Sequence, residues 1–153
     1  MDQPLCMFIP HAIGMREGQI LLAKNSSTIS HSYKWTGNPA TANSGNNVLI
    51  APKGSVPIKG LVADRLPIKI ECNIHNWIGG WVRVFDHPYF AVTAGDGAFE
   101  LRNAPAGEYR LMVWHGSGGW LGCKDGRNGQ LINIPAGKTL EMGELKYQPP
   151  IDN

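Results

Sequence analysis

The sequence predicts an all-β fold, on the evidence of its turn-forming residues and of the spacing of its apolar residues. Of the 153 residues, 19 are glycine and 11 are proline, whereas only 17% are charged. Such a chain forms many turns and has little material for long amphipathic helices. Several segments also alternate apolar and polar residues with the period of two that is typical of strands. We therefore expect strands joined by frequent turns and no long helix.

The first half of the chain contains the clearest strand patterns. Residues 8–25 predict a strand, a turn at Glu17 and Gly18, and a second strand. The segments "PIKIEC" and "WVRVF" alternate like two further strands. Residues 35–55 are rich in Asn, Gly, Ser and Pro, and they predict a long loop with at most a short strand at residues 48–50.

The second half, from about Asp86 onward, has a different pattern. Its apolar residues follow a period of two, with "GDG" and "APAG" as the intervening turns, which predicts a β-meander; these residues are Phe99, Leu101, Tyr109, Leu111 and Val113. A glycine-rich loop at residues 116–129 follows, and "LINIPAG" and "LEMGELKY" predict two more strands.

Charge and hydropathy exclude several classes of function. The net charge is +2 at pH 7 and the basic residues are scattered, so the sequence does not support nucleic-acid binding. Apolar runs such as "GQILLA" are too short to insert into a membrane. The opening residues "MDQPLCMF" lack the basic and apolar regions of a signal peptide.

The segment "ECNIHNWIGG" contains the first candidate for chemistry. It places Cys72 and His75 three residues apart in one short loop. A soft thiolate together with imidazole nitrogens is the donor set that suits copper. By itself the pair fits a buried cysteine beside a loop histidine equally well.

The spacing of Pro10, Gly18, Asn25 and His31 resembles the opening strands of plastocyanin-like cupredoxins. There the proline begins a strand, the glycine turns it, the asparagine ends the next strand, and the histidine is the first copper ligand. "CNIHNWI" resembles the short ligand loop of amicyanin, and "WVRVF" resembles the closing cupredoxin strand. The resemblance covers roughly residues 5–85 and implies a Greek-key cupredoxin β-sandwich or barrel.

The resemblance also implies a set of copper ligands. His31, Cys72 and His75 match the three equatorial ligands, and Ile78 stands at the axial position, where the family has methionine. The axial thioether is a weak, long bond that tunes a copper site, so a non-ligating Ile78 is compatible with metal binding. Ser32 replaces an asparagine that ties the two ligand loops together, and we expect its hydroxyl to make one such bond where an amide makes two.

The three cysteines, an odd number, leave several pairings open. In an oxidising compartment they predict one disulfide and one remaining thiol. Cys6 could be an additional metal ligand, or the disulfide partner of Cys123 or Cys72, and we favour a structural role over ligation. "CMFIPH", "CNIHNW" and "FDHPYFAVTAGDGAFEL" together resemble a group of bacterial exported proteins. That resemblance implies a periplasmic or otherwise extracytoplasmic location.

The second half of the chain is similar to the carboxypeptidase regulatory-like, transthyretin-like β-sandwich module, on the segment "GDGAFELRNAPAGEYRLMVWH". We therefore divide the chain into a cupredoxin-like copper domain, residues 1–84, and a transthyretin-like β domain, residues 85–153. Asp96 is expected in a hairpin turn instead of a calcium site. His11, His87 and His115 could form a second copper site, although histidines near turns are usually structural.

The function predicted from these features is that of a type 1 (blue) copper protein, which carries single electrons between redox partners. A partner would dock near His75 and Trp77, beside the second flanking aromatic residue Trp81. No nucleophile motif, carboxylate pair or His-x-His pair indicates an enzyme. Two alternatives stay open: a copper-binding or trafficking protein, and a structural or interaction module with a degenerate copper site.

Overall fold

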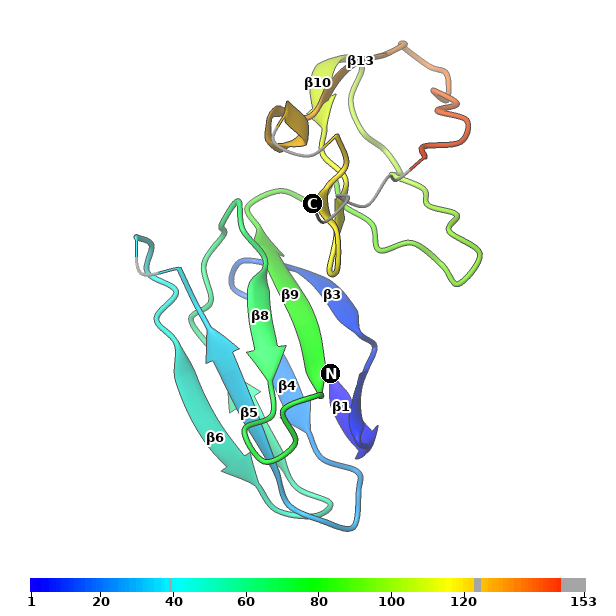
Figure 1. The fold of residues 1–153 in the computed structure, drawn as a ribbon. Coiled ribbons are helices and arrows are strands. Elements are labelled where there is room, and N and C mark those ends of the chain that lie inside the picture. The colour runs from blue at the N-terminus through cyan, green and yellow to red at the C-terminus, as the bar shows by residue number, and fades with distance from the viewer. Residues whose placement is uncertain (39, 123–124, 147–153) are drawn as a thin grey trace. The chain divides into compact units, whose positions relative to one another are not determined.

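The computed structural model describes residues 1–38, 40–122 and 125–146, and its regular structure is almost entirely β (Figure 1). The chain divides into two compact units, Met1–Glu100 and Leu101–Asn153. The strands of the first unit are β1 (Asp2–Leu5), β2 (Met7–Ile9), β3 (Ala12–Arg16), β4 (Leu21–Lys24), β5 (His31–Thr36), β6 (Asn46–Ile50), β7 (Ser55–Ile58), β8 (Ile68–Glu71) and β9 (Gly79–Phe85).

The first unit is built from two sheets. One has the strand order β2-β1-β4-β7 and the other β3-β9-β8-β5-β6. The β1–β4 and β3–β9 pairs are parallel, and the other neighbouring strands are antiparallel. The chain therefore crosses repeatedly from one sheet to the other, and β5, β6, β8 and β9 form one layer with β4 in the layer behind them (Figure 1). This arrangement confirms the predicted all-β sandwich.

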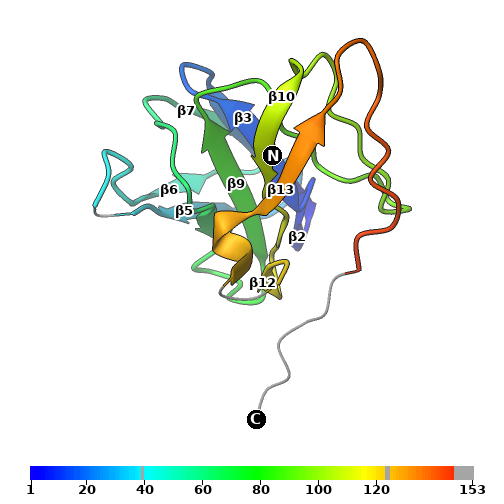
Figure 2. The same cartoon turned by 90° about the horizontal axis from the view of Figure 1, so that it is seen from above.

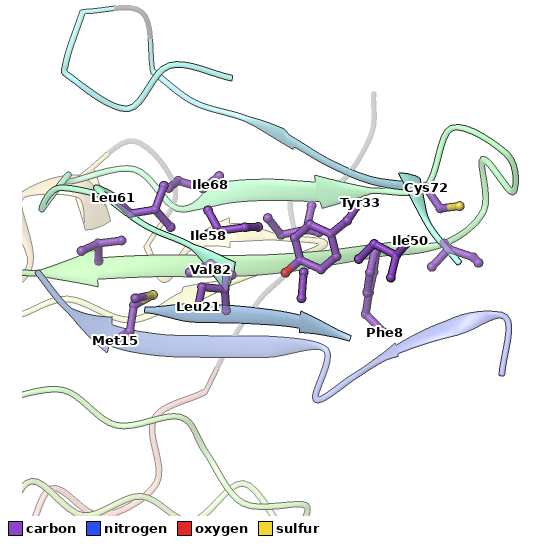
Figure 3. Packing of buried hydrophobic residues seen from close by; sticks show 14 residues of the cluster. Phe8, Met15, Leu21, Tyr33, Ile50, Ile58, Leu61, Ile68, Cys72 and Val82 are labelled. Atoms are coloured by element: carbon purple, nitrogen blue, oxygen red, sulfur yellow. The ribbon is translucent and has the colours of Figure 1, made fainter. Parts of the chain in front are cut away.

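The core of the first unit lies between these two sheets. Alternation explains which side chains enter it, since Val82 and Val84 of β9 and Ile68 and Ile70 of β8 are buried while their neighbours are more exposed. Burying a side chain of this size stabilises the fold by about 1.5–3 kcal/mol. Cys72 lies at one end of the buried cluster, and Met15 and Leu61 lie at the other (Figure 3).

The predicted turn at Glu17 and Gly18 is confirmed. Gly18 has a φ of +85°, a conformation that favours glycine. The single strand predicted before this turn is divided into β2 and β3, which belong to different sheets. The division falls at Pro10, whose ring nitrogen has no hydrogen to donate to a ladder.

The long loop predicted for residues 35–55 is shorter in the structure. Strand β6 pairs with β5 over five residue pairs, from His31↔Ile50 to Trp35↔Asn46, so it begins before the predicted residues 48–50. Strand β7 was not predicted. Asparagines at 46 and 47 disfavour a strand locally, but the neighbouring strand β5 supplies hydrogen-bond partners that outweigh this preference.

The second unit contains β10 (Gly107–Leu111), β11 (Trp114–His115), β12 (Gly119–Trp120), the 3-10 helix η1 (Asp125–Asn128) and β13 (Gln130–Ile134). Strands β10 and β13 pair antiparallel and lie side by side (Figure 2).

The strands predicted around Phe99 and at residues 140–146 are absent, and residue 147 lies outside the described residues. A segment with alternating apolar residues forms a strand only where a neighbouring strand pairs with its backbone N–H and C=O groups. The division at residue 84 and the transthyretin-like assignment stay predictions.

No helix in the part of the chain that the structure describes is both long enough and apolar enough to cross a membrane.

A test of the first unit concerns Asp2, which connects β1 to the segment after β4. Its carboxylate accepts hydrogen bonds from Ser26 N–H at 2.9 Å and Ser26 Oγ at 2.6 Å, and lies 3.4 Å from Lys24 Nζ. Burial raises the pKa of Asp2, but the Ser26 hydrogen bonds and Lys24 outweigh burial and lower the pKa below its usual value. We expect Asp2→Asn to reduce the free energy of unfolding by about 1–2 kcal/mol at neutral pH.

This loss should depend on pH in a defined direction. Because the folded state has the lower pKa, the stabilisation is complete above the unfolded pKa of about 4 and disappears as the pH falls through the folded value. Urea unfolding of both proteins at several pH values measures the difference, which should shrink in acid. Asp86→Asn, at an exposed carboxylate, is the control. If the loss of stability in Asp2→Asn stays constant with pH, the ionised carboxylate of Asp2 is not the group that stabilises the fold.

Candidate metal centre

Two neighbouring strands and one short loop bring His31, Cys72 and His75 together. His31 is the first residue of β5, Cys72 follows the last residue of β8, and His75 lies in the loop between β8 and β9. Strands β5 and β8 run antiparallel with Lys34 opposite Glu71, so the beginning of β5 lies beside the end of β8. The three side chains therefore meet at one end of the core (Figure 3 shows Cys72 at this end).

The donor atoms of these side chains form a compact triangle. The two Nδ1 atoms of His31 and His75 are 3.2 Å apart, and Cys72 Sγ lies 3.8 Å from the first and 3.9 Å from the second. A point equidistant from all three lies about 2.1 Å from each, close to the bond lengths of about 2.0–2.1 Å for nitrogen and about 2.3 Å for sulfur at protein metal sites. The residues present therefore fit a metal ion held by two imidazoles and one thiolate.

The site is closed on one side and open on the other. His31 is 0% exposed and Cys72 is 1% exposed, whereas His75 is only half-buried. Burial lowers the pKa of His31, and the neighbouring His75 lowers it further. Both effects favour the neutral imidazole, the form whose lone pair can bind a metal.

The thiol of Cys72 is also in a state suited to binding a metal. Burial raises its pKa, but hydrogen bonds outweigh burial and lower the pKa below its usual value; they come from the backbone of His75, the Ser32 hydroxyl, and the backbone of Ile74 and Ser32. These groups stabilise the thiolate, which is the form of cysteine that coordinates metals.

Backbone hydrogen bonds close the ligand loop. Cys72 N–H donates to the Ile78 carbonyl at 3.3 Å, and Ile78 N–H donates to the His75 carbonyl at 3.0 Å. Ile78 is 2% exposed and belongs to the buried cluster. Its side chain has no donor atom, so the loop itself provides two of the three candidate ligands, Cys72 and His75, and Ile78 adds none.

Ser32 corrects an expectation from the sequence. Its hydroxyl makes two contacts with the other ligand loop where one was expected: Oγ accepts a hydrogen bond from Asn73 N–H at 2.6 Å and lies 3.7 Å from Cys72 Sγ as a donor. A hydroxyl can do both because it has one hydrogen and two lone pairs. Ser32 therefore ties the two ligand-bearing segments together.

Asn25 is a residue whose role the sequence did not define, beyond its spacing from His31. It is fully buried, and its Nδ2 donates to the carbonyls of Ile29, Ile50 and Ala51 at 2.8, 3.0 and 3.2 Å. Its Oδ1 accepts hydrogen bonds from the Ser27 backbone and hydroxyl. Asn25 thus fixes the segment that leads into His31 against the end of β6.

The other predicted site residues lie outside this group. Cys6 is an exposed free thiol between β1 and β2, and Cys72 is also free, so these two cysteines are not bonded to each other. Cys123 lies outside the described residues.

His11, His87 and His115 are exposed, and among the described residues the structure groups none of them with two further potential ligands. Asp96 lies in the predicted turn, where its Oδ1 accepts a hydrogen bond from Ala98 N–H at 3.0 Å.

Trp77 is the aromatic neighbour of the candidate ligands. Its ring meets the His75 ring edge-on with centroids 5.2 Å apart, and the residue is 69% exposed. Trp81, the other flanking tryptophan, is half-buried within β9. Trp77 therefore presents an apolar surface to solvent beside the one candidate ligand that solvent can approach.

Comparison with known proteins gives structural similarities only. No family model matches the chain, and no curated protein matches its sequence. Solved structures that resemble it include a Cu(I) form, a reduced state and an oxidised state of three amicyanin variants. Each has a TM-score of 0.48 and 12% sequence identity, over 55% of this chain and 78% of the amicyanin chain.

The hydrogen bonds of Asn25 can be tested by mutation. We expect Asn25→Ala to reduce the free energy of unfolding by about 3 kcal/mol, because it leaves one buried and two partly buried carbonyls without this donor. Urea unfolding of the metal-free protein measures the change. Asn47→Ala on the exposed side of β6 is the matched control and should change stability by less than about 0.5 kcal/mol. Equal effects of the two substitutions would show that Asn25 does not hold the loop.

Proposed function

We propose that this chain is a type 1 copper protein that transfers single electrons, with copper bound by His31, Cys72 and His75. The observation that supports the proposal is the triangle of donor atoms, whose centre suits a metal bound by two nitrogens and one sulfur. The resemblance of the sequence to cupredoxins supports copper over other metals, as does the preference of copper for a thiolate with two imidazoles.

Bound copper would supply a centre that alternates between Cu(II) and Cu(I), accepting one electron from a donor protein and passing it to an acceptor. The residues of the chain keep the ligands in place during this exchange. His31 holds the buried side, and the Cys72 thiolate is stabilised by its hydrogen bonds. His75 connects the site to the surface. No substrate position is required, so the proposed function is not enzymatic.

We further propose that redox partners dock on the ligand loop. Ile74 and Trp77 flank His75 in sequence and are 51% and 69% exposed. Residues 72–80 include no Asp, Glu, Lys or Arg. Redox encounters use small and weak interfaces, for which a few exposed apolar residues are sufficient. The sequence resemblance to exported bacterial proteins supports an extracytoplasmic location.

Addition of Cu(II) to the reduced, metal-free protein tests the proposed function. We expect an intense thiolate-to-copper absorption band and the EPR signal of a type 1 site, and neither should form in Cys72→Ser. A colourless protein would contradict the proposal. Titration with Cu(I) would then separate the alternatives, since tight Cu(I) binding indicates trafficking and no binding indicates a structural module.

Replacement of Ile78 tests the role of the apolar side chain at the axial position. We expect Ile78→Met to lower the reduction potential, because a thioether donor stabilises Cu(II) relative to a three-coordinate site. Protein-film voltammetry measures the shift. Ile58→Met, a core substitution in the opposite sheet, controls for repacking and should leave the potential unchanged. An equal or higher potential for Ile78→Met would contradict a tuning role for Ile78.

A further inference from the structure

We propose that the hydroxyl of Ser32 is a positioning and tuning group for the Cys72 sulfur, raising the reduction potential of the site by donating a hydrogen bond to the thiolate. This inference rests on the proposed function and assigns a role to a residue that is not itself a ligand. It also concerns a position at which the sequence departs from the cupredoxin pattern.

The direction of the two hydrogen bonds follows from the chemistry of the groups. Asn73 N–H is a donor only, so at 2.6 Å it must use a lone pair of Ser32 Oγ. A thiolate has no hydrogen and is an acceptor only. The single hydroxyl hydrogen therefore points to Cys72 Sγ, 3.7 Å away, which is within the range of hydrogen bonds to sulfur.

The backbone places the hydroxyl where it can make both bonds. Pairing of Lys34 with Glu71 and of Trp35 with Ile70 brings Ser32 beside the residues that follow β8. On its other side, Ser32 pairs with Leu49 of β6. The Nε2 of Gln3, a fully buried side chain, donates to the Ser32 carbonyl at 3.4 Å. Strand β6 and Gln3 therefore hold the backbone of Ser32, and the hydrogen bond from Asn73 N–H holds its buried hydroxyl.

Burial makes the interaction stronger than it would be at the surface. Ser32 is 4% exposed and Cys72 is 1% exposed, so water does not compete for the hydrogen bond. The bond from Asn73 N–H also polarises the hydroxyl and makes it a better donor, since linked hydrogen bonds reinforce one another in a medium of low dielectric constant.

A hydrogen bond to the sulfur acts on the two oxidation states differently. It withdraws electron density from the thiolate, which weakens the bond to Cu(II) more than the bond to Cu(I). Hydrogen bonding around the cysteine sulfur is accordingly one of the factors that set the potential of such sites. The effect of Ser32 is therefore to favour reduction, in the same direction as the apolar Ile78.

The test compares three variants. Ser32→Ala removes the donor, and Ser32→Thr retains it. Ser27→Ala is the matched control, because Ser27 is also buried in the segment leading to His31 but its hydroxyl contacts Asn25 Oδ1 at 2.7 Å and the Ile29 carbonyl at 2.9 Å. The alanine control removes hydrogen bonds of the segment between β4 and β5 without removing the donor to sulfur.

We expect Ser32→Ala to reduce the equilibrium constant for reduction by about threefold to tenfold, a decrease in potential of about 28–59 mV. The thiolate-to-copper band of Ser32→Ala should move to longer wavelength. Ser32→Thr should keep both the potential and the band position of the wild type. Ser27→Ala should change neither. An unchanged potential in Ser32→Ala, or an equal shift in Ser27→Ala, would overturn the tuning role.

A second measurement does not require copper. Amide hydrogen exchange of the metal-free protein reports on Asn73 N–H, which should exchange at least about tenfold faster in Ser32→Ala than in wild type. Its protection should persist in Ser27→Ala. Equal exchange of Asn73 in wild type and Ser32→Ala would overturn the hydrogen-bond bridge itself.

Together the two measurements separate failure of this inference from failure of the proposed function. Copper binding by the wild type with no response in Ser32→Ala would overturn the tuning role alone. Absence of copper binding in the wild type would overturn the proposed function and the tuning role that rests on it, and amide exchange would still decide whether Ser32 bridges the two segments.

Discussion

The antiparallel register between β5 and β8 is the constraint on which the rest of the candidate site depends. Pairing of Lys34 with Glu71 sets the beginning of one strand beside the end of the other, and His31 and Cys72 occupy these two positions. A shift of one residue would turn every side chain of the strand to the opposite face. The apolar residues Ile68 and Ile70 oppose such a shift, because they would leave the core. Burial of Ile68 and Ile70 therefore fixes the register of β8 against β5, and this register sets the separation of His31 and Cys72.

Placing polar groups at the end of an apolar core has a cost, and the structure shows how it is offset. Burial disfavours the charged forms of both His31 and Cys72. For the imidazole the neutral form results, whereas for the thiol the hydrogen bonds from Ser32 and the loop backbone reverse the effect of burial. The same surroundings thus favour the neutral form of the imidazole and stabilise the thiolate form of the cysteine. Exposure of His75 then gives the site a single side that faces solvent.

The two halves of the chain differ in how well alternation predicted their strands. In the first unit the predicted strands at "PIKIEC" and "WVRVF" correspond to β8 and β9, which pair with each other. In the later part of the chain two predicted strands form as β10 and β13, but the patterns near Phe99 and at residues 140–146 form no strand. Alternation describes which face of a segment is apolar. Whether the segment becomes a strand depends on a partner for its backbone hydrogen bonds, and no local pattern contains that information.

The sequence by itself determined the chemistry of the candidate site: the types of donor residue, the short spacing between Cys72 and His75, and the lack of a donor at Ile78. It also determined the all-β class, through its glycines, prolines and alternating segments. The tertiary structure decided the arrangement, because the 3.2 Å between the histidine nitrogens joins residues 44 positions apart. The double role of Ser32 and the anchoring by Asn25 were likewise decided by folding. Pairing of β5 with β8 within one sheet brings Ser32 to Asn73, whereas packing of the two sheets brings Asn25 to Ile50. In both cases folding places segments that are distant in sequence within hydrogen-bonding distance.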